Sequence, residues 1–174
     1  MNEFVTEMDG AFQELVLNLA LEVNLYKDLE NLLKDKQSSI IRGDIESLQS
    51  IVHEEQRLIP KIQTATSARE LRASTIGAVS KLRANTPSLK ELIDLSPSHH
   101  QRELIEFRED LIMSLDQIAR NNRENEFLLN SSVELVRGLV QVLLGTDEDE
   151  RFHYGGRGII TEKRSQKSRV DCQI

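Results

Sequence analysis

Histidine and carboxylate side chains are the residues of this chain whose types and spacing could do chemistry. His53 lies beside Glu54 and Glu55, and His99 is followed directly by His100. Imidazole and carboxylate groups are ligands of Zn²⁺, so folding that gathered them could create a metal site. Adjacent residues on a helix diverge by about 100°, however, and no HExxH or CxxC spacing is present. We therefore expect solvated surface histidines, no metal and no cofactor.

Enzyme chemistry has little other support in the sequence. The most plausible enzyme of helical-bundle type needs a Glu-x-x-His motif on each of two helices, and no pair of expected helices carries it. Charged residues fall on the expected helix seams, among them Glu22, Lys36 and Glu55. Paired seam charges that set the register of neighbouring helices are the interpretation we favour. We expect no catalytic residues.

Composition indicates helices that pack along seams. Of 174 residues, 4% are aromatic and 29% are charged, and the net charge is −7. This mixture is typical of long helices, and the acidic balance argues against nucleic-acid binding. The one cysteine, Cys172, excludes an internal disulfide. We find no apolar run near the roughly 20 residues that cross a bilayer, and no signal-peptide pattern at the start. A cytoplasmic protein without membrane insertion is expected.

Two long helices are predicted in the first half of the chain. Apolar positions recur at alternating steps of three and four residues between residues 4 and 41, which is the period of a coiled-coil seam. Gly43 can end this helix and Asp44 can cap the next one, so the second helix should run back antiparallel toward Ala84. Pro60 lies inside this second helix and predicts a kink or break near Ile59.

A short helix and a third long helix are predicted in the second half. Thr86 with Pro87 and Ser96 with Pro97 each fit a cap residue followed by proline at the first helical position. A short helix is therefore expected over about residues 87 to 95. The seam of the last helix is predicted to include Leu104, Phe107, Leu111, Leu115, Ile118, Asn122, Asn125 and Leu129, with a stutter at Leu115.

The predicted fold class is all-α. A long antiparallel helical hairpin, extended to a three-helix coiled-coil bundle, should occupy residues 1–145. Residues 146–174 contain glycine, serine and balanced charge, with four acids in a row followed mostly by basic residues. Such a composition predicts a flexible, disordered C-terminal tail.

The end of the third helix carries more apolar residues than one seam requires. They lie in the stretch EFLLNSSVELVRGLVQVLL and include Phe127, Leu128, Val133, Val136, Leu139, Val140 and Leu143. This face either closes the bundle or a dimer, or forms a groove for an amphipathic helix of another protein. Periodicity leaves both possibilities open. A membrane-surface helix would need flanking Lys and Arg, and Arg137 is nearly alone.

The tail contains the segment FHYGGRGII, in which Phe152 and Tyr154 stand beside glycines. Three glycines suit a flexible linker, but linkers rarely carry two aromatic residues. Aromatic anchors in a disordered segment are typical of a short peptide that folds on a partner. We favour the docking interpretation.

The order of these features resembles the FlgN family of flagellar export chaperones. The resemblance is carried by YKDL, LLKDKQ and the turn RGDIESL, then by IVHEEQRLI and NNRENEFLL, and finally by YGGRG in the tail. It covers most of the chain. Each motif is weak alone, and the ordered combination is what carries the resemblance.

The resemblance implies a cytosolic chaperone without ATPase activity. Such a protein binds the C-terminal helices of the hook-filament junction proteins FlgK and FlgL, prevents their premature assembly, and delivers them to the export gate protein FlhA. By position, the segment from Phe127 to Leu143 would bind the client. Tyr154, Gly155 and Gly158, with Phe152 beside them, would dock on the gate. The alternative is a self-assembling structural coiled-coil protein.

Overall fold

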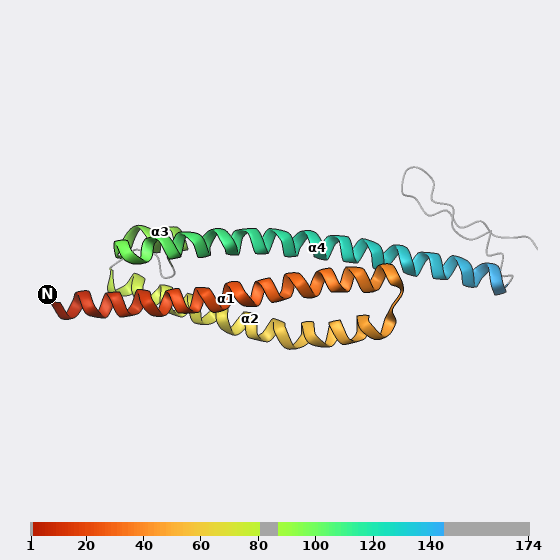
Figure 1. Cartoon of the computed structure of the whole chain (residues 1–174), viewed down its shortest axis with the longest axis horizontal. Coiled ribbons are helices and arrows are strands. Elements are labelled where there is room, and N and C mark those ends of the chain that lie inside the picture. Colours follow the sequence, from red (N-terminus) through yellow and green to blue (C-terminus); the bar gives the residue numbers. More distant parts are fainter. Residues whose placement is uncertain (1, 81–86, 145–174) are drawn as a thin grey trace, which may run out of the picture. The chain divides into compact units, whose positions relative to one another are not determined.

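A computed structural model describes residues 2–80 and 87–144, with side-chain surroundings from residue 7 onward. It contains four helices over these residues: α1 (Asn2–Arg42), α2 (Ile45–Val79), α3 (Leu89–Leu95) and α4 (Ser98–Leu144), as Figure 1 shows. The predicted all-α class is confirmed. The chain divides into two compact units, residues 1–129 and 130–174. The proposed tail lies outside the described residues, and the domain boundary at residue 145 stays a prediction.

The turn between α1 and α2 forms as the sequence predicts. Gly43 has a φ of 67°, a left-handed conformation that glycine adopts without strain. Its N–H donates to the carbonyl of Ile40, and the N–H of Asp44 donates to Ser39, which together close a Schellman motif. The carboxylate of Asp44 then accepts from the backbone N–H and the hydroxyl of Ser47, which caps α2. This turn sends α2 back along α1.

Seam charges hold α1 and α2 in antiparallel register, as predicted. Glu22, which is 1% exposed, accepts hydrogen bonds from the hydroxyl of Thr66 at 2.7 Å and from Arg69 Nε at 2.8 Å. Nearer the turn, Lys36 Nζ lies 2.7 Å from a carboxylate oxygen of Glu55. Because the partner numbers fall on α2 as they rise on α1, these pairs fit only one alignment of the two helices.

Pro60 does not break α2. The helix runs continuously from Ile45 to Val79 with Pro60 inside it, so of the two outcomes predicted near Ile59, a kink or a break, the break is wrong. Pro60 is exposed, and its ring therefore lies away from the α1 seam. The hydroxyl of Thr64 donates to the carbonyl of Pro60 at 2.9 Å. Proline lacks a backbone N–H and so removes one hydrogen bond from the helix. The helical residues on both sides of Pro60 keep α2 continuous in spite of that loss.

The short helix begins later than expected. α3 starts at Leu89, and its cap is Ser88, which forms a capping box with Glu91. The predicted start at Thr86 and Pro87 is wrong, and Thr86 lies outside the described residues. The second proline-marked start agrees with the structure, because α4 begins at Ser98 directly after Pro97.

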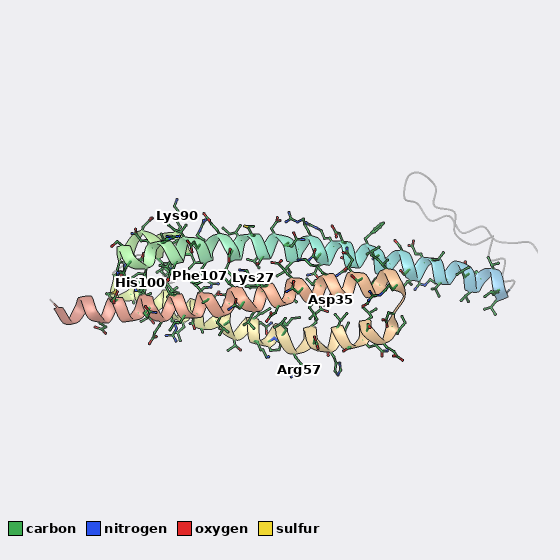
Figure 2. All side chains as sticks on the ribbon, in the orientation of Figure 1. Lys27, Asp35, Arg57, Lys90, His100 and Phe107 are labelled. Carbon is green, nitrogen blue, oxygen red and sulfur yellow. The ribbon has the colours of Figure 1, made fainter. Side chains whose placement is uncertain are left out.

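The main core lies where the start of α1, the end of α2, α3 and the start of α4 meet, and Figure 2 shows the side chains gathered between these helices. The buried apolar cluster consists of Phe12, Leu15, Val16, Leu19, Val23, Ala73, Ile76, Leu92, Leu104 and Leu111. On α1, Phe12, Leu15 and Leu19 keep the predicted steps of three and four, and Val16 and Val23 widen the buried face beyond that seam.

The seam of α4 differs from the predicted one in two positions. Ser114 and Asn121 are buried, whereas Leu115 and Asn122 are exposed. From Leu104 onward the buried residues are Leu104, Leu111, Ser114, Ile118, Asn121 and Asn125, with Phe107 packed against the core. Their spacing is a regular alternation of three and four, so the predicted stutter is wrong. The preference for leucine over serine as a seam residue caused the error.

α4 lies parallel to α1 within the first unit. Lys27 Nζ lies 2.7 Å from Asp110. Farther along, the Asn125 amide donates to the carbonyl of Leu33 at 2.9 Å in a buried contact. Partner numbers rise together on the two helices, which is the pattern of a parallel pair. α1 is thus held by α2 through one set of contacts and by α4 through another.

Candidate functional site

The last part of α4, residues 130–144, is apolar and exposed. Every residue there except Gly138 is exposed. The large apolar side chains range from Val140, at 45% exposed, to Leu143, at 83%, and comprise Val133, Leu135, Val136, Leu139, Val140, Val142, Leu143 and Leu144. A segment that exposes so many apolar side chains is typical of a surface that another molecule covers.

A polar stripe runs along one side of this apolar surface. Asn130, Glu134, Arg137 and Gln141 recur at steps of four, three and four residues along α4, which places them on one side of the helix. At 100° per residue, the eight large apolar side chains cover roughly 200° of the circumference on the other side, twice the stripe of an ordinary surface helix. One neighbouring helix cannot cover a face of this width. The segment therefore suits insertion between two helices.

Two of the predicted binding residues lie in the first unit. Phe127 is 70% exposed, and Leu128 is half-buried. Both line a shallow hollow together with Gln37, Arg123 and Glu124, where Gln37 of α1 donates to Glu124 at 2.9 Å. Leu135, Val142 and Leu144 were not among the predicted binding residues, although their exposure is as great as that of the predicted ones. The 3.5-residue seam period led away from them.

Within the described residues, one stretch of 18 residues in α4 is long and apolar enough to cross a membrane by length and composition, and none of it is buried. The sequence was expected to contain no apolar run near the length that spans a bilayer, and this stretch comes close to that length. An exposed face for a protein partner passes the same test, so the stretch is no argument for a membrane.

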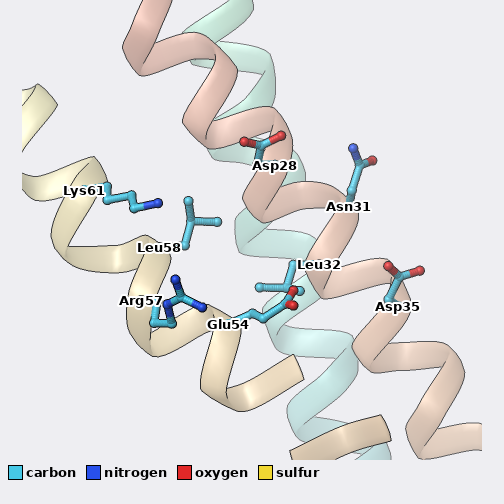
Figure 3. A pocket seen from close by; sticks show the side chains of 8 residues that line it. All are labelled: Asp28, Asn31, Leu32, Asp35, Glu54, Arg57, Leu58 and Lys61. Atoms are coloured by element: carbon cyan, nitrogen blue, oxygen red, sulfur yellow. The ribbon is translucent and has the colours of Figure 1, made fainter. Parts of the chain in front are cut away.

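A hollow between α1 and α2 does not resemble an active site. It has a volume of about 440 Å³, and Asp28, Asn31, Leu32, Asp35, Glu54, Arg57, Leu58 and Lys61 line it, as Figure 3 shows. The lining includes neither a histidine nor a hydroxyl or thiol nucleophile. Asp28 and Asp35 of α1 lie across two leucines from Arg57 and Lys61 of α2, which is the arrangement of a solvated groove along a helix pair. The hollow thus offers no group for nucleophilic catalysis.

The histidines behave differently from one another. His53 is exposed, as expected, and His99 is exposed on the first turn of α4. His100 is buried, with its ring 6.5 Å from that of Phe12. The expectation that all of these are solvated surface histidines is therefore wrong for His100. The start of α4 points this side chain into the core beside the start of α1.

Comparison with known proteins decides the family. The family model described as FlgN protein matches residues 8–161, which is most of the chain and includes all three long helices. This chain belongs to the FlgN family. The suspected resemblance is confirmed by a match that extends from α1 into the YGGRG segment. Neither the search of curated proteins nor the search of solved structures returned a match.

Membership in the FlgN family identifies a flagellar export chaperone in general terms. The family is one of chaperones rather than enzymes, and its members are generally soluble cytoplasmic proteins that bind flagellar export substrates. The proposed gate-docking residues Phe152, Tyr154, Gly155 and Gly158 lie outside the described residues. The exposed apolar part of α4 is therefore the surface on which the structure bears directly.

Proposed function

We propose that this FlgN-family chaperone binds the C-terminal helices of the hook-filament junction proteins FlgK and FlgL through the last part of α4. The observation that carries the proposal is the exposed apolar face of residues 130–144. This face extends over roughly 200° of the helix circumference, outside the polar stripe. The binding residues are Phe127, Leu128, Val133, Val136, Leu139, Val140 and Leu143, to which the exposure of the neighbouring residues adds Leu135, Val142 and Leu144.

The physical basis is burial of two complementary apolar faces. A client helix that packs along a seam in its assembled state exposes an apolar stripe before assembly. Burying one leucine or valine side chain contributes about 1.5–3 kcal/mol, and ordering a helix on binding opposes much of that gain. The complex can therefore be specific and still dissociate without nucleotide. Covering the client stripe prevents premature assembly.

We further propose that the tail docks on the export gate protein FlhA through Phe152, Tyr154, Gly155 and Gly158. The sequence supports this proposal, because two aromatic side chains stand among glycines in a segment too polar to form a core. Separation of the two sites along the chain would let the gate hold the tail while α4 holds the client.

Client binding is tested with a peptide that contains the C-terminal helix of FlgK. The full chain with Leu139→Glu should bind the peptide at least about 30-fold more weakly, because losing one buried leucine costs about 2 kcal/mol and the new charge would be desolvated as well. Gln141→Glu is the matched control, since it adds the same charge on the polar stripe of the same segment. Isothermal titration calorimetry measures both affinities.

Light scattering after size exclusion separates the chaperone from a self-assembling coiled-coil protein. A chaperone should form a mixed complex of defined mass when the FlgK peptide is added. A self-assembling protein would ignore the peptide and form larger species through the same apolar face, which Leu139→Glu would dissociate. Equal affinities for Leu139→Glu and Gln141→Glu would refute the assignment of the surface.

Gate docking is tested separately from client binding. Tyr154→Ala should weaken binding to the cytoplasmic domain of FlhA and leave the affinity for the FlgK peptide unchanged. His153→Ala, a neighbour outside the docking residues, serves as the control. Unchanged FlhA binding by Tyr154→Ala would refute the docking proposal.

A further inference from the structure

Three side chains with metal-binding atoms meet where the start of α1 faces the start of α4. His99 Nε2 lies 2.8 Å from Asp9 Oδ1, and His100 Nε2 lies 3.2 Å from the same oxygen. The three ligand atoms all lie within 4.8 Å of one another. The two imidazole rings have centroids 4.1 Å apart and are tilted by 46°, so adjacent residues direct their Nε2 atoms toward one carboxylate.

The polar atoms at this place are not satisfied by hydrogen bonds. Asp9 Oδ1 and His100 Nε2 are both buried, and neither has a hydrogen-bond partner among the described residues, in spite of their short separation. The His100 side chain is 5% exposed. A buried polar atom without a partner costs about 1–3 kcal/mol. An ion between the three atoms would satisfy both orphaned atoms at once, because each lone pair would then point at the ion.

Two of the three distances between the ligand atoms fit a first-row transition ion. Zn²⁺ binds imidazole nitrogen and carboxylate oxygen at about 2.0–2.2 Å, so two ligand atoms of a tetrahedral site lie about 3.3 Å apart. The two Nε2–Oδ1 distances of 2.8 and 3.2 Å differ from this separation by half an ångström or less. Two histidines and one carboxylate leave the fourth position of a tetrahedral ion for water.

We propose that Asp9, His99 and His100 form a binding site for Zn²⁺ or a similar divalent transition ion. The proposal is independent of the chaperone role. The nearby N-terminus of α4 disfavours a cation by only about 0.3–1 kcal/mol, which is small beside the free energy of metal coordination. Because Asp9 lies on α1 and both histidines lie on α4, the ion cross-links two elements some 90 residues apart in sequence.

The expected consequence is local stiffening of the first unit. The ion holds the early turns of α1 against α4 beside Phe12, which belongs to the main core. Ligand binding to the folded state alone raises its stability in proportion to the logarithm of ligand concentration over Kd. Zn²⁺ should therefore raise the melting temperature and slow amide exchange around Asp9, and leave residues 130–144 unaffected.

The test uses the full chain with His153→Gln and Cys172→Ser, which removes the imidazole and the thiol of the tail. Zinc chloride is titrated into this protein by calorimetry. His99→Ala and Asp9→Asn should each weaken the affinity by more than about tenfold, since even indirect partners of a metal contribute 10- to 100-fold. Both side chains are largely exposed, at 60% and 47%, so these variants should keep their fold, as circular dichroism would verify.

His53→Ala is the matched control, because it removes an exposed histidine that lies outside the cluster. The proposal predicts one Zn²⁺ per chain, weaker binding in both ligand variants and unchanged binding in the control. Absence of saturable Zn²⁺ binding would overturn it. So would an affinity that His99→Ala and Asp9→Asn leave unchanged, or that His53→Ala lowers equally.

Discussion

Replacing Arg69 with methionine should strongly destabilise the first unit, because it leaves the Glu22 carboxylate buried without its cation. Glu22 is 1% exposed, and Arg69 Nε donates to it at 2.8 Å. Thr66 remains as a single hydrogen-bond donor, at 2.7 Å. Removing one partner of a buried ion pair costs about 3–5 kcal/mol, and the partial exposure of Arg69, at 22%, favours the lower end.

Urea denaturation followed by circular dichroism measures this effect. With a denaturant slope of about 2 kcal/mol per molar urea, a loss of about 3 kcal/mol lowers the midpoint by about 1.5 M. Arg72→Met is the matched control on the same helix, because Arg72 pairs with Glu14 at an exposed position. An exposed pair contributes about 0–1 kcal/mol.

A double variant separates the buried charge from lost packing. Glu22→Leu combined with Arg69→Met removes both charges and should restore most of the stability, since apolar replacements of buried ion pairs are often neutral or stabilising. If Arg69→Met shifts the urea midpoint no more than Arg72→Met does, the reasoning from burial is refuted. A double variant as unstable as Arg69→Met alone would assign the loss to packing instead.

Four further substitutions test other contacts. Leu111→Ala should lower the free energy of unfolding by about 3 kcal/mol because Leu111 is buried. Leu115→Ala should lower it by less than about 1 kcal/mol because Leu115 is exposed. Equal losses in urea denaturation would show that Leu115 belongs to the seam, as a stutter requires. Hydrogen bonds from the backbone and hydroxyl of Ser47 hold the pKa of Asp44 below its ordinary value of 3.8. The carboxylate therefore stabilises the fold above that pH and loses its effect as the pH falls through the lowered pKa. Asp44→Ala should lower the melting temperature at pH 7, and its difference from the unchanged chain should vanish in acid; a difference independent of pH would contradict the capping role. Gly43→Ala should cost about 1 kcal/mol, because a φ of 67° strains a side chain, and thermal melting measures the loss.

Much of the fold could be predicted because its signals are local or periodic. The steps of three and four residues located the seam of α1, and Gly43 followed by Asp44 located the turn. The paired seam charges Glu22 and Lys36 followed from their positions among apolar residues. Each of these signals lies within a few turns of helix, which is the range over which sequence spacing fixes geometry.

The errors arose where distant packing decides the outcome. Ser114 is buried although it is small and polar, and nothing local distinguishes it from the exposed Leu115. His100 meets Asp9 across some 90 residues, a juxtaposition that no short motif encodes. Exposure of the last part of α4 was foreseen as one of two possibilities, because periodicity shows that a face is apolar and does not show what covers it.

The polar residues buried along α4 give the first unit an uneven resistance to opening. Around the start of α1 the interior is mostly apolar, and His100 is buried beside it, whereas toward Gly43 the buried positions of α4 include Ser114, Asn121 and Asn125. Separating α4 from α1 at the second place exposes amides that water solvates readily, so it costs less than exposing the leucines at the first. Thermal fluctuations should therefore separate α4 from α1 first at the Gly43 end, while the helices stay packed at the opposite end.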